Sequence, residues 1–466
     1  MLSEEEIKKK VQVFTPEYYA SIMASLLGIE TTDDITILDN SCGTGNLLVA
    51  TSRIIIDFLK SQKYQDSEIT VFLAKTIFGF DVDEEMVNST RKNLNNLLNE
   101  YGLPSIDWNI QVKDFLSEEA KANYDFIISN PPYIEYRNLS ENQRQFLSKK
   151  YTSCSFGKYD YYYAFIEHSL NCLSDRGRMV FLVPNNVFKT LSGGPLRELM
   201  KPSVEKIIDF CCTKVFNTNQ VQTSSAIISF EKNNHNDSIL YSTSLEDVEK
   251  EIKKSDLSGK WMFQEVNTVG VPFGSLFDVH QSVATLRNSV FIHDSKPDIE
   301  EKLLYIATSP KDEHAKKRRY IIIPYLRTQN DEIKRFEETI FERFFPKTYL
   351  FLLAEKKTLT ESDKDKGSHW FEFGRSQGLA YIWKEKLMLS PIISTTVKVY
   401  ELDSETIPYS GIVITQKKGS NKSLSLAKQI LSSDSFLEYC QQIGVNINGH
   451  SMRITTNDIK NYLVKK

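Results

Sequence analysis

The chain has 466 residues, which is too long for one domain of typical size and predicts at least two. It carries 57 Lys and Arg against 61 Asp and Glu, so a uniformly basic surface for binding nucleic acid is excluded. The six cysteines form no Cys-x-x-Cys pair, and no apolar run reaches the ~18 residues of a membrane span. Residues 1–10 are charged, unlike a signal peptide, so we expect a cytoplasmic protein with no bound metal and no membrane contact.

The first predicted strand, residues 35–38, leads into a turn from Asp39 that contains Gly43 and Gly45. A helical pattern follows over residues 47–60, which completes the first unit of a doubly wound sheet. The turn lacks the third glycine of a dinucleotide site and the Gly-Lys-Ser/Thr of a phosphate loop. An acid at the strand end suits a cofactor with positive charge and no phosphate, as in S-adenosyl-L-methionine. Gly-x-Gly alone is also a common structural turn.

Two further strands end in acids. Residues 77–80 lead to Asp81, which can accept both hydroxyls of a ribose, whereas Asp83 is placed to cap the next helix. A third strand ends near residue 112, and Asp114 and Phe115 follow as candidates to bind an adenine amine and to stack on its ring. Taken alone, this last pair also fits a surface acid and a core aromatic.

The most informative motif is Asn130-Pro131-Pro132-Tyr133, directly after the predicted strand 124–129. Proline fixes its own φ and keeps the preceding residue out of the helical region, so the loop is stiff. The Asn130 side-chain oxygen and the Pro131 carbonyl are two acceptors that can hold a planar –NH2 group, with the ring of Tyr133 beside them. The same tetrapeptide is also compatible with an ordinary turn.

In this order, the motifs resemble those of S-adenosylmethionine-dependent amino-methyltransferases. Within that group, residues 14–230 are similar to the gamma class of N6-adenine DNA methyltransferases from Type II restriction-modification systems. The resemblance implies cofactor binding by Thr15, Asp39, Gly43, Gly45, Asp81, Asp114 and Phe115, catalysis by Asn130, Pro131 and Tyr133, and stacking on the target base by Tyr133 and Phe216.

The resemblance also implies the architecture: an α/β chain with a Rossmann-like, seven-stranded methyltransferase sheet whose last strand, residues 225–230, is antiparallel. The polar stretch 231–237 reads as a linker. We therefore expect an S-adenosylmethionine-dependent catalytic domain over residues 1–240. A C-terminal α+β domain for recognition of the DNA target is expected over residues 241–466.

Basic residues of this second domain are candidates for contact with DNA phosphates. They are Lys316, Lys317, Arg318, Arg319, Arg327, Lys334, Arg335 and Arg343. Each run taken singly is also typical of a solvated surface. Arg375 and Gln377, in a Gly-Arg turn, are candidates to read bases, and a structural turn is the alternative.

The expected activity is transfer of a methyl group from S-adenosyl-L-methionine to N6 of an adenine flipped out of double-stranded DNA, which protects the host DNA from restriction. The expected partners are DNA and a separately encoded restriction endonuclease, and the expected state is a monomer. Two alternatives remain open. The motif also serves methylation of guanine amines in RNA and of protein glutamine, and the chain could be the modification subunit of a complex that is inactive alone.

Overall fold

The computed structural model describes residues 14–31, 33–120, 124–211, 215–216, 224–263, 269–330, 332–361, 364–448 and 451–465. The charged residues 1–10 lie outside these ranges. The chain divides into two compact units, Met1–Gln264 with Val445–His450, and Glu265–Gly444 with Ser451–Lys466. Among the described residues, no helix is long and apolar enough to cross a membrane.

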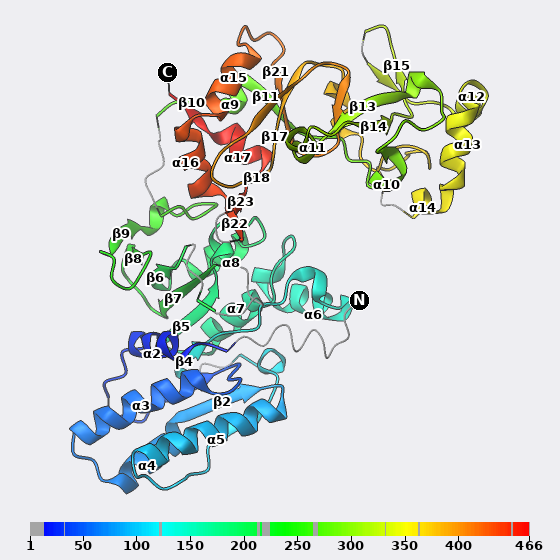
Figure 1. The fold of residues 1–466 in the computed structure, drawn as a ribbon. Coiled ribbons are helices and arrows are strands. Elements are labelled where there is room, and N and C mark those ends of the chain that lie inside the picture. Colours follow the sequence, from blue (N-terminus) through cyan, green and yellow to red (C-terminus); the bar gives the residue numbers. More distant parts are fainter. Residues whose placement is uncertain are drawn as a thin grey trace. The chain divides into compact units, whose positions relative to one another are not determined.

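A nine-stranded sheet forms the centre of the first unit (Figure 1). Its strands, in spatial order, are β3 (Asn109–Val112), β2 (Ile77–Asp81), β1 (Ile37–Asp39), β4 (Tyr124–Ser129), β5 (Leu173–Pro184), β7 (Ser225–Glu231), β6 (Val204–Asp209), β8 (Ser238–Ser242) and β9 (Lys250–Lys253). The first five strands are parallel, and β7 runs antiparallel to both β5 and β6. The expected α/β class with a reversed seventh strand is confirmed.

The expectation of seven strands is wrong, because β8 pairs with β6 and β9 pairs with β8. The segment 231–237, expected as a linker, connects β7 to β8 inside this sheet. Beyond it, the rings of Tyr241 and Phe263 stack at 4.2 Å, and Trp261 is fully buried against Phe188. The first unit therefore continues past the expected boundary at residue 240, and these aromatic side chains are part of its core.

Helices cover both faces of the sheet. One face carries α2 (Glu17–Leu26), α3 (Asn46–Ser61), α4 (Asp66–Thr76) and α5 (Glu84–Glu100), and the other carries α6 (Glu141–Lys150), α7 (Tyr162–Cys172) and α8 (Gly194–Met200). Because side chains alternate along a strand, Ile37 joins the core under the first group and Leu38 the core under the second. The sheet is thus buried on both sides, which leaves its strand ends as the place for a ligand.

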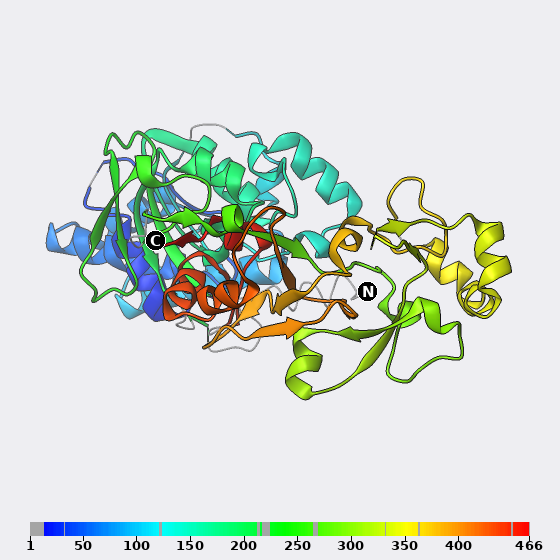
Figure 2. The same ribbon diagram turned by 90° about the horizontal axis from the view of Figure 1, so that it is seen from above.

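The second unit contains two four-stranded sheets (Figure 2). One has the order β11 (Phe277–Gln281), β21 (Ile412–Gln416), β17 (Lys386–Leu389), β19 (Val399–Leu402), and its neighbours are all antiparallel. The other has the order β12 (Ile292–His293), β14 (Arg319–Ile322), β13 (Leu304–Thr308), β20 (Thr406–Pro408), and only its β13–β20 pair is parallel. The expected C-terminal α+β architecture is confirmed.

Helices and short strands complete this unit. The strand pairs are β10 (Val271–Pro272) with β24 (Leu463–Val464), β15 (Leu326–Arg327) with β16 (Ile333–Lys334), and β18 (Ile392–Ile393) with β23 (Ser451–Arg453). The helices are α9 (Phe273–Leu276), α10 (Asn288–Phe291), α11 (Pro310–Ala315), α12 (Glu338–Phe344), α13 (Pro346–Ala354), α14 (Lys356–Thr360), α15 (Leu424–Leu431), α16 (Asp434–Ile443) and α17 (Thr456–Asn461).

Candidate active site

Four neighbouring strand ends carry the polar residues that the sequence singled out. The order β3-β2-β1-β4 is parallel throughout, so all four carboxyl ends lie at one edge of the sheet. Asp39 ends β1 and Asp81 ends β2, whereas Asp114 follows β3 and Asn130 follows β4. The geometry required of a ligand site in an open α/β sheet is therefore present.

The turn after β1 is fixed by backbone contacts to β2. The Gly43 amide donates to Asp81 Oδ2 at 2.9 Å, and the Asp83 amide donates to Asp81 Oδ1 at 3.0 Å. Asp81 thus braces the turn itself, and its remaining lone pairs are the ones available to a ribose. Asp83 accepts from the Glu85 amide and caps α5, as the sequence predicted.

Gly43 and Gly45 both have positive φ, at 52° and 86°. A Cβ on Gly45 would lie 2.8 Å from Thr90 Cγ2, so this glycine allows α5 to approach the turn closely. A Cβ on Gly43 would only touch the ring of Phe14 at 3.5 Å. The conformation of both residues is set by the turn, and the close approach at Gly45 is to a helix of the chain itself.

Asp39 is the most strongly perturbed acid of the site. It is 1% exposed, and burial raises its pKa to about 8, with Asp81 adding to the shift. Its Oδ1 accepts from the Ser41 amide at 3.1 Å, while Oδ2 is buried without a partner among the described residues. An orphaned carboxylate oxygen fits a ligand that brings an N–H donor or a positive charge, such as the ammonium or sulfonium of S-adenosyl-L-methionine.

Asp114 and Phe115 have different environments. Asp114 is exposed and caps a short 3-10 helix by accepting from the Leu116 amide at 3.0 Å. Phe115 is only 3% exposed and meets His168 edge to face, with ring centroids 4.6 Å apart. In the structure without a ligand, Asp114 is thus a surface acid and Phe115 a core aromatic, which is the structural alternative to adenine binding that the sequence left open.

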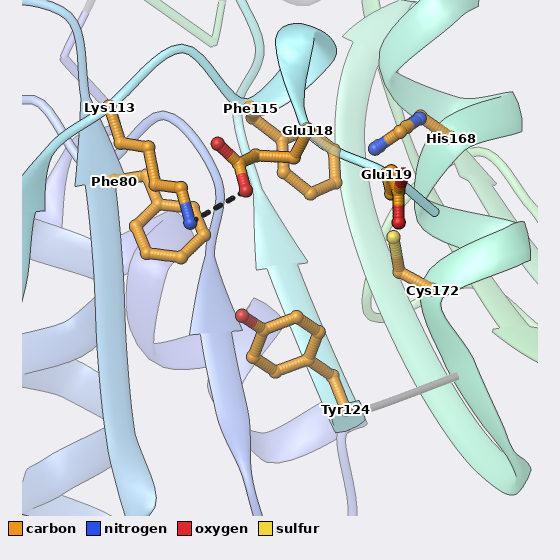
Figure 3. Close-up of a pocket in the computed structure, with 8 residues that line it drawn as sticks. All are labelled: Phe80, Lys113, Phe115, Glu118, Glu119, Tyr124, His168 and Cys172. Carbon is orange, nitrogen blue, oxygen red and sulfur yellow. Dashed lines mark ion pairs between the residues drawn. The ribbon is translucent and has the colours of Figure 1, made fainter. Parts of the chain in front are cut away.

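Phe115 also lines a cavity of about 260 Å³ on the face of the sheet that carries α7 (Figure 3). The other lining residues are Phe80, Lys113, Glu118, Glu119, Tyr124, His168 and Cys172. Two of these lining residues, Lys113 and Glu118, form an ion pair at 2.9 Å (Figure 3). Burial lowers the pKa of His168 to about 4, which keeps the imidazole neutral at pH 7. Sequence reasoning missed His168, because a histidine within a buried helix carries no pattern of its own.

The loop after β4, which begins at Asn130, is held from several sides. The Tyr133 hydroxyl donates to the Leu182 carbonyl at 3.1 Å, and Pro131 is buried. Tyr133 and Phe216 meet with ring centroids 6.4 Å apart at an interplanar angle of 70°. The two predicted stacking residues are therefore brought together, but edge to face. A base inserted between them has to part the rings.

A polar network ties this loop to the turn after β1. The Ser41 hydroxyl donates to the Asn130 carbonyl at 3.3 Å and lies 3.2 Å from the Ser129 hydroxyl. Ser129 donates to Asn40 Oδ1 at 2.6 Å. Sequence reasoning passed over Asn40 and Ser41, although both lie in the turn that it identified. The Asn40 amide and the Ser41 hydroxyl are neutral side chains that are common in turns, so residue type alone does not indicate their contacts.

Thr15 also contacts the Asn130 loop. It is 4% exposed, and its hydroxyl accepts from Asn130 Nδ2 at 3.0 Å. Its carbonyl accepts from Asn46 Nδ2 at 2.8 Å. Thr15, the turn after β1 and the Asn130 loop therefore form one connected assembly.

In the second unit, many of the candidate DNA-binding residues are engaged by acids. Their ion pairs are Lys317 with Asp294, Arg319 with Asp294 and Asp312, Arg327 with Glu405, Arg335 with Glu372, and Arg375 with Asp365. Lys316, Arg318, Lys334 and Arg343 are exposed and have no ion pair among the described residues. These four are the stronger candidates for contact with phosphate.

Comparison with known proteins identifies several similar proteins. Residues 58–216 match the Eco57I restriction-modification methylase family. Type II methyltransferase M.BstVI from Geobacillus stearothermophilus is 26% identical over 255 residues, which cover 52% of this chain and 45% of that protein. Type II restriction enzyme and methyltransferase RM.Eco57I from Escherichia coli is 23% identical over 470 residues, covering 78% and 46%. Type II methyltransferase M.HincII from Haemophilus influenzae is 36% identical over 132 residues, covering 27% and 25%.

The chain thus spans less than half the length of these curated relatives. Among solved structures, the Type IIL restriction-modification enzyme MmeI in complex with DNA aligns with a TM-score of 0.61 at 16% identity, covering 97% of this chain and 64% of MmeI. At that identity the likeness shows the fold alone. The expected cofactor, S-adenosyl-L-methionine, is the one that the matched methylase family implies. Over residues 58–216, this chain is similar to the Eco57I restriction-modification methylase family, and parts of it are similar to Type II methyltransferases.

Proposed function

We propose that this protein is a site-specific DNA methyltransferase that transfers a methyl group from S-adenosyl-L-methionine to N6 of adenine. The main support for this proposal is the hydrogen bond from the Ser41 hydroxyl to the Asn130 carbonyl at 3.3 Å, which links the Asn130 loop to the turn after β1. This bond holds the loop that is proposed to bind an –NH2 group next to the turn that is proposed to bind a positively charged cofactor. The relationship to Type II methyltransferases supports DNA as the substrate.

The cofactor supplies an electrophilic methyl group when it is bound. Asp39 would hold its positive end, because Oδ2 is buried and lacks a partner among the described residues. Asp81 would accept the ribose hydroxyls with those lone pairs of its two carboxylate oxygens that the Gly43 and Asp83 amides do not occupy. Asp114 is proposed for the adenine amine of the cofactor, and Phe115, at the edge of the cavity, for its ring.

Asn130 and Pro131 are the proposed catalytic residues. The exocyclic nitrogen of adenine is a poor nucleophile because its lone pair is delocalised into the ring. If Asn130 Oδ1 and the Pro131 carbonyl accept its two hydrogens, the nitrogen turns pyramidal and directs its lone pair at the methyl group. The same acceptors stabilise the positive charge that develops on nitrogen before it releases a proton, which is preorganised electrostatic catalysis.

The target base must leave the duplex to reach this loop, at a cost of a few kcal/mol. Stacking of the base on Tyr133 and Phe216 would offset that cost by about 1–3 kcal/mol per ring. The second unit is proposed to recognise the DNA sequence, with phosphate contacts from Lys316, Arg318 and their exposed neighbours. A monomer suffices for this reaction, and a separately encoded restriction endonuclease is the proposed partner.

Asn130→Ala tests the mechanism. We expect turnover to fall by at least about 10²-fold, since a preorganised acceptor is lost, while binding of S-adenosyl-L-methionine measured by calorimetry stays close to wild type. Asn138→Ala, at an exposed asparagine eight residues further along the chain, is the matched control. A fully active Asn130→Ala enzyme would refute the mechanism.

Long-read sequencing of DNA from an adenine-methylation-free host that expresses the chain tests the substrate. N6-methyladenine at one short motif supports the proposal. Unmodified DNA from well-expressed protein favours an RNA guanine or protein glutamine substrate, or a modification subunit that needs a partner.

A further inference from the structure

The hydrogen bond between Thr15 and Asn130 joins two segments that are 115 residues apart in the chain. Thr15 precedes α2, and Asn130 follows β4. The bond runs from Asn130 Nδ2 to the Thr15 hydroxyl at 3.0 Å, and Thr15 is 4% exposed. A buried hydroxyl that holds the side-chain nitrogen of the proposed catalytic asparagine acts directly on the orientation of that side chain.

Thr15 is itself held in place. Asn46 Nδ2 donates to the Thr15 carbonyl at 2.8 Å, and the Thr44 hydroxyl donates to Asn46 Oδ1 at 3.3 Å. The second bond fixes which way the Asn46 amide faces. Thr44 lies in the turn after β1 and Asn46 is the first residue of α3, so Thr15 is positioned by the segment that directly follows the proposed cofactor acid Asp39.

The orientation of Asn130 matters because a primary amide is chemically two-sided. Its oxygen only accepts hydrogen bonds and its nitrogen only donates them. An exocyclic –NH2 group needs acceptors, so a side chain turned by 180° would set two donors against each other. With Nδ2 bound to Thr15, the planar amide directs Oδ1 away from Thr15.

We propose that Thr15 is a positioning residue, whose hydroxyl holds Asn130 Nδ2 and so keeps Oδ1 turned toward the substrate amine. This inference rests on the proposed function, because it assigns the Thr15 hydroxyl a part in the methyl-transfer step that is separate from any contact of the Thr15 backbone with the cofactor. It predicts that loss of the hydroxyl slows the chemical step while the cofactor still binds.

Three variants isolate the hydroxyl. Thr15→Val keeps the shape and removes the hydroxyl, and Thr15→Ser keeps the hydroxyl. Thr51→Val removes another buried threonine hydroxyl, which bonds only to the Leu47 carbonyl within α3 at 2.8 Å, and is the matched control. The methylation rate in a single turnover with saturating cofactor and substrate reports the chemical step, and calorimetry reports the dissociation constant of S-adenosyl-L-methionine.

We expect Thr15→Val to lower the single-turnover rate by about tenfold or more, equivalent to ~1.4 kcal/mol in the barrier, with an unchanged dissociation constant for the cofactor. Thr15→Ser restores the rate, and Thr51→Val leaves it unchanged. If Thr15→Val melts below the assay temperature, Thr15→Ala replaces it, since the backbone bond to Asn46 remains.

An unchanged rate for Thr15→Val would overturn the proposal. So would weaker cofactor binding with a normal rate at saturation, because Thr15 would then be only a cofactor contact. The comparison is made on whichever amine substrate the wild-type protein methylates. The substrate of the wild-type protein therefore tests the assignment of adenine, and the Thr15 variants separately test the positioning role.

Discussion

The buried carboxyl of Asp39 makes the stability of the cofactor-free protein depend on pH. Its pKa is raised from 3.8 to about 8, with burial as the main cause. Between those two values the folded protein keeps a proton that the unfolded chain releases. The free energy of unfolding therefore falls as pH rises through this window, by up to ~1.4 kcal/mol per pH unit, and levels off above pH 8.

From pH 6 to pH 7.5 this amounts to a loss of up to about 2 kcal/mol of stability that depends on Asp39. Asp39→Asn has the same shape and does not titrate, so it should lack this loss. Urea denaturation of both proteins without cofactor at the two pH values measures the difference, since groups that are not coupled to Asp39 titrate equally in both. Parallel pH dependence in wild type and Asp39→Asn would refute the reasoning.

Cofactor binding provides an independent measurement on the same group. A positive charge placed at Asp39 Oδ2 favours the carboxylate and lowers its pKa. At pH 6.5 the wild-type protein should therefore release about one proton on binding S-adenosyl-L-methionine, and Asp39→Asn should release none. Calorimetry in two buffers of different ionisation enthalpy counts the protons. An equal count for the two proteins would show that the cofactor's charge lies elsewhere.

Three other perturbations test the site and the second unit. Gly45→Ala should lower the melting temperature by more than Gly102→Ala does. Both glycines have positive φ, but a Cβ at position 45 would contact Thr90 of α5, whereas a Cβ at position 102 has no heavy atom within 4 Å. Equal losses would exclude the steric contribution. Phe216→Ala should weaken capture of the flipped base by about 1–3 kcal/mol, measured with a fluorescent base analogue, and unchanged capture would remove Phe216 from the site. Arg318→Ala should lower affinity for DNA and reduce the slope of log K against log salt by about 0.9, and a slope equal to wild type would show that Arg318 contacts no phosphate.

The sequence predicted the strands around the site well because each is a short apolar run that ends in a polar residue. Residues 124–129 were expected as a strand and form β4 with the same bounds. The strands β8 and β9 were missed because both are short and partly polar. In β8 the side chains of Ile239, Tyr241 and Ser242 are buried, whereas Leu240 is 39% exposed. Such a strand is identified by its partner β6, which local sequence does not reveal.

Within the site, residue types could be predicted but their hydrogen-bond partners could not. An acid at the end of β2 was expected to bind a ribose, yet Asp81 also accepts the Gly43 and Asp83 amides that shape the turn. The bond from Asn130 to Thr15 spans 115 residues and follows from packing of α2 beside the sheet. Motifs therefore located the proposed reacting groups, whereas the orientation of these groups depends on tertiary contacts.

The basic run at residues 316–319 illustrates the same limit for electrostatics. Four consecutive cations suggest a surface for phosphate, but Arg319 lies in β14 and bridges to Asp312, whose side chain is 5% exposed. Lys317 and Arg319 both reach Asp294 as well. Removing Arg319 would leave the buried carboxylate of Asp312 without its cationic partner, which costs stability whether or not DNA is bound. Arg318, exposed between two paired neighbours, is the position at which a loss of DNA affinity reports phosphate contact instead of folding.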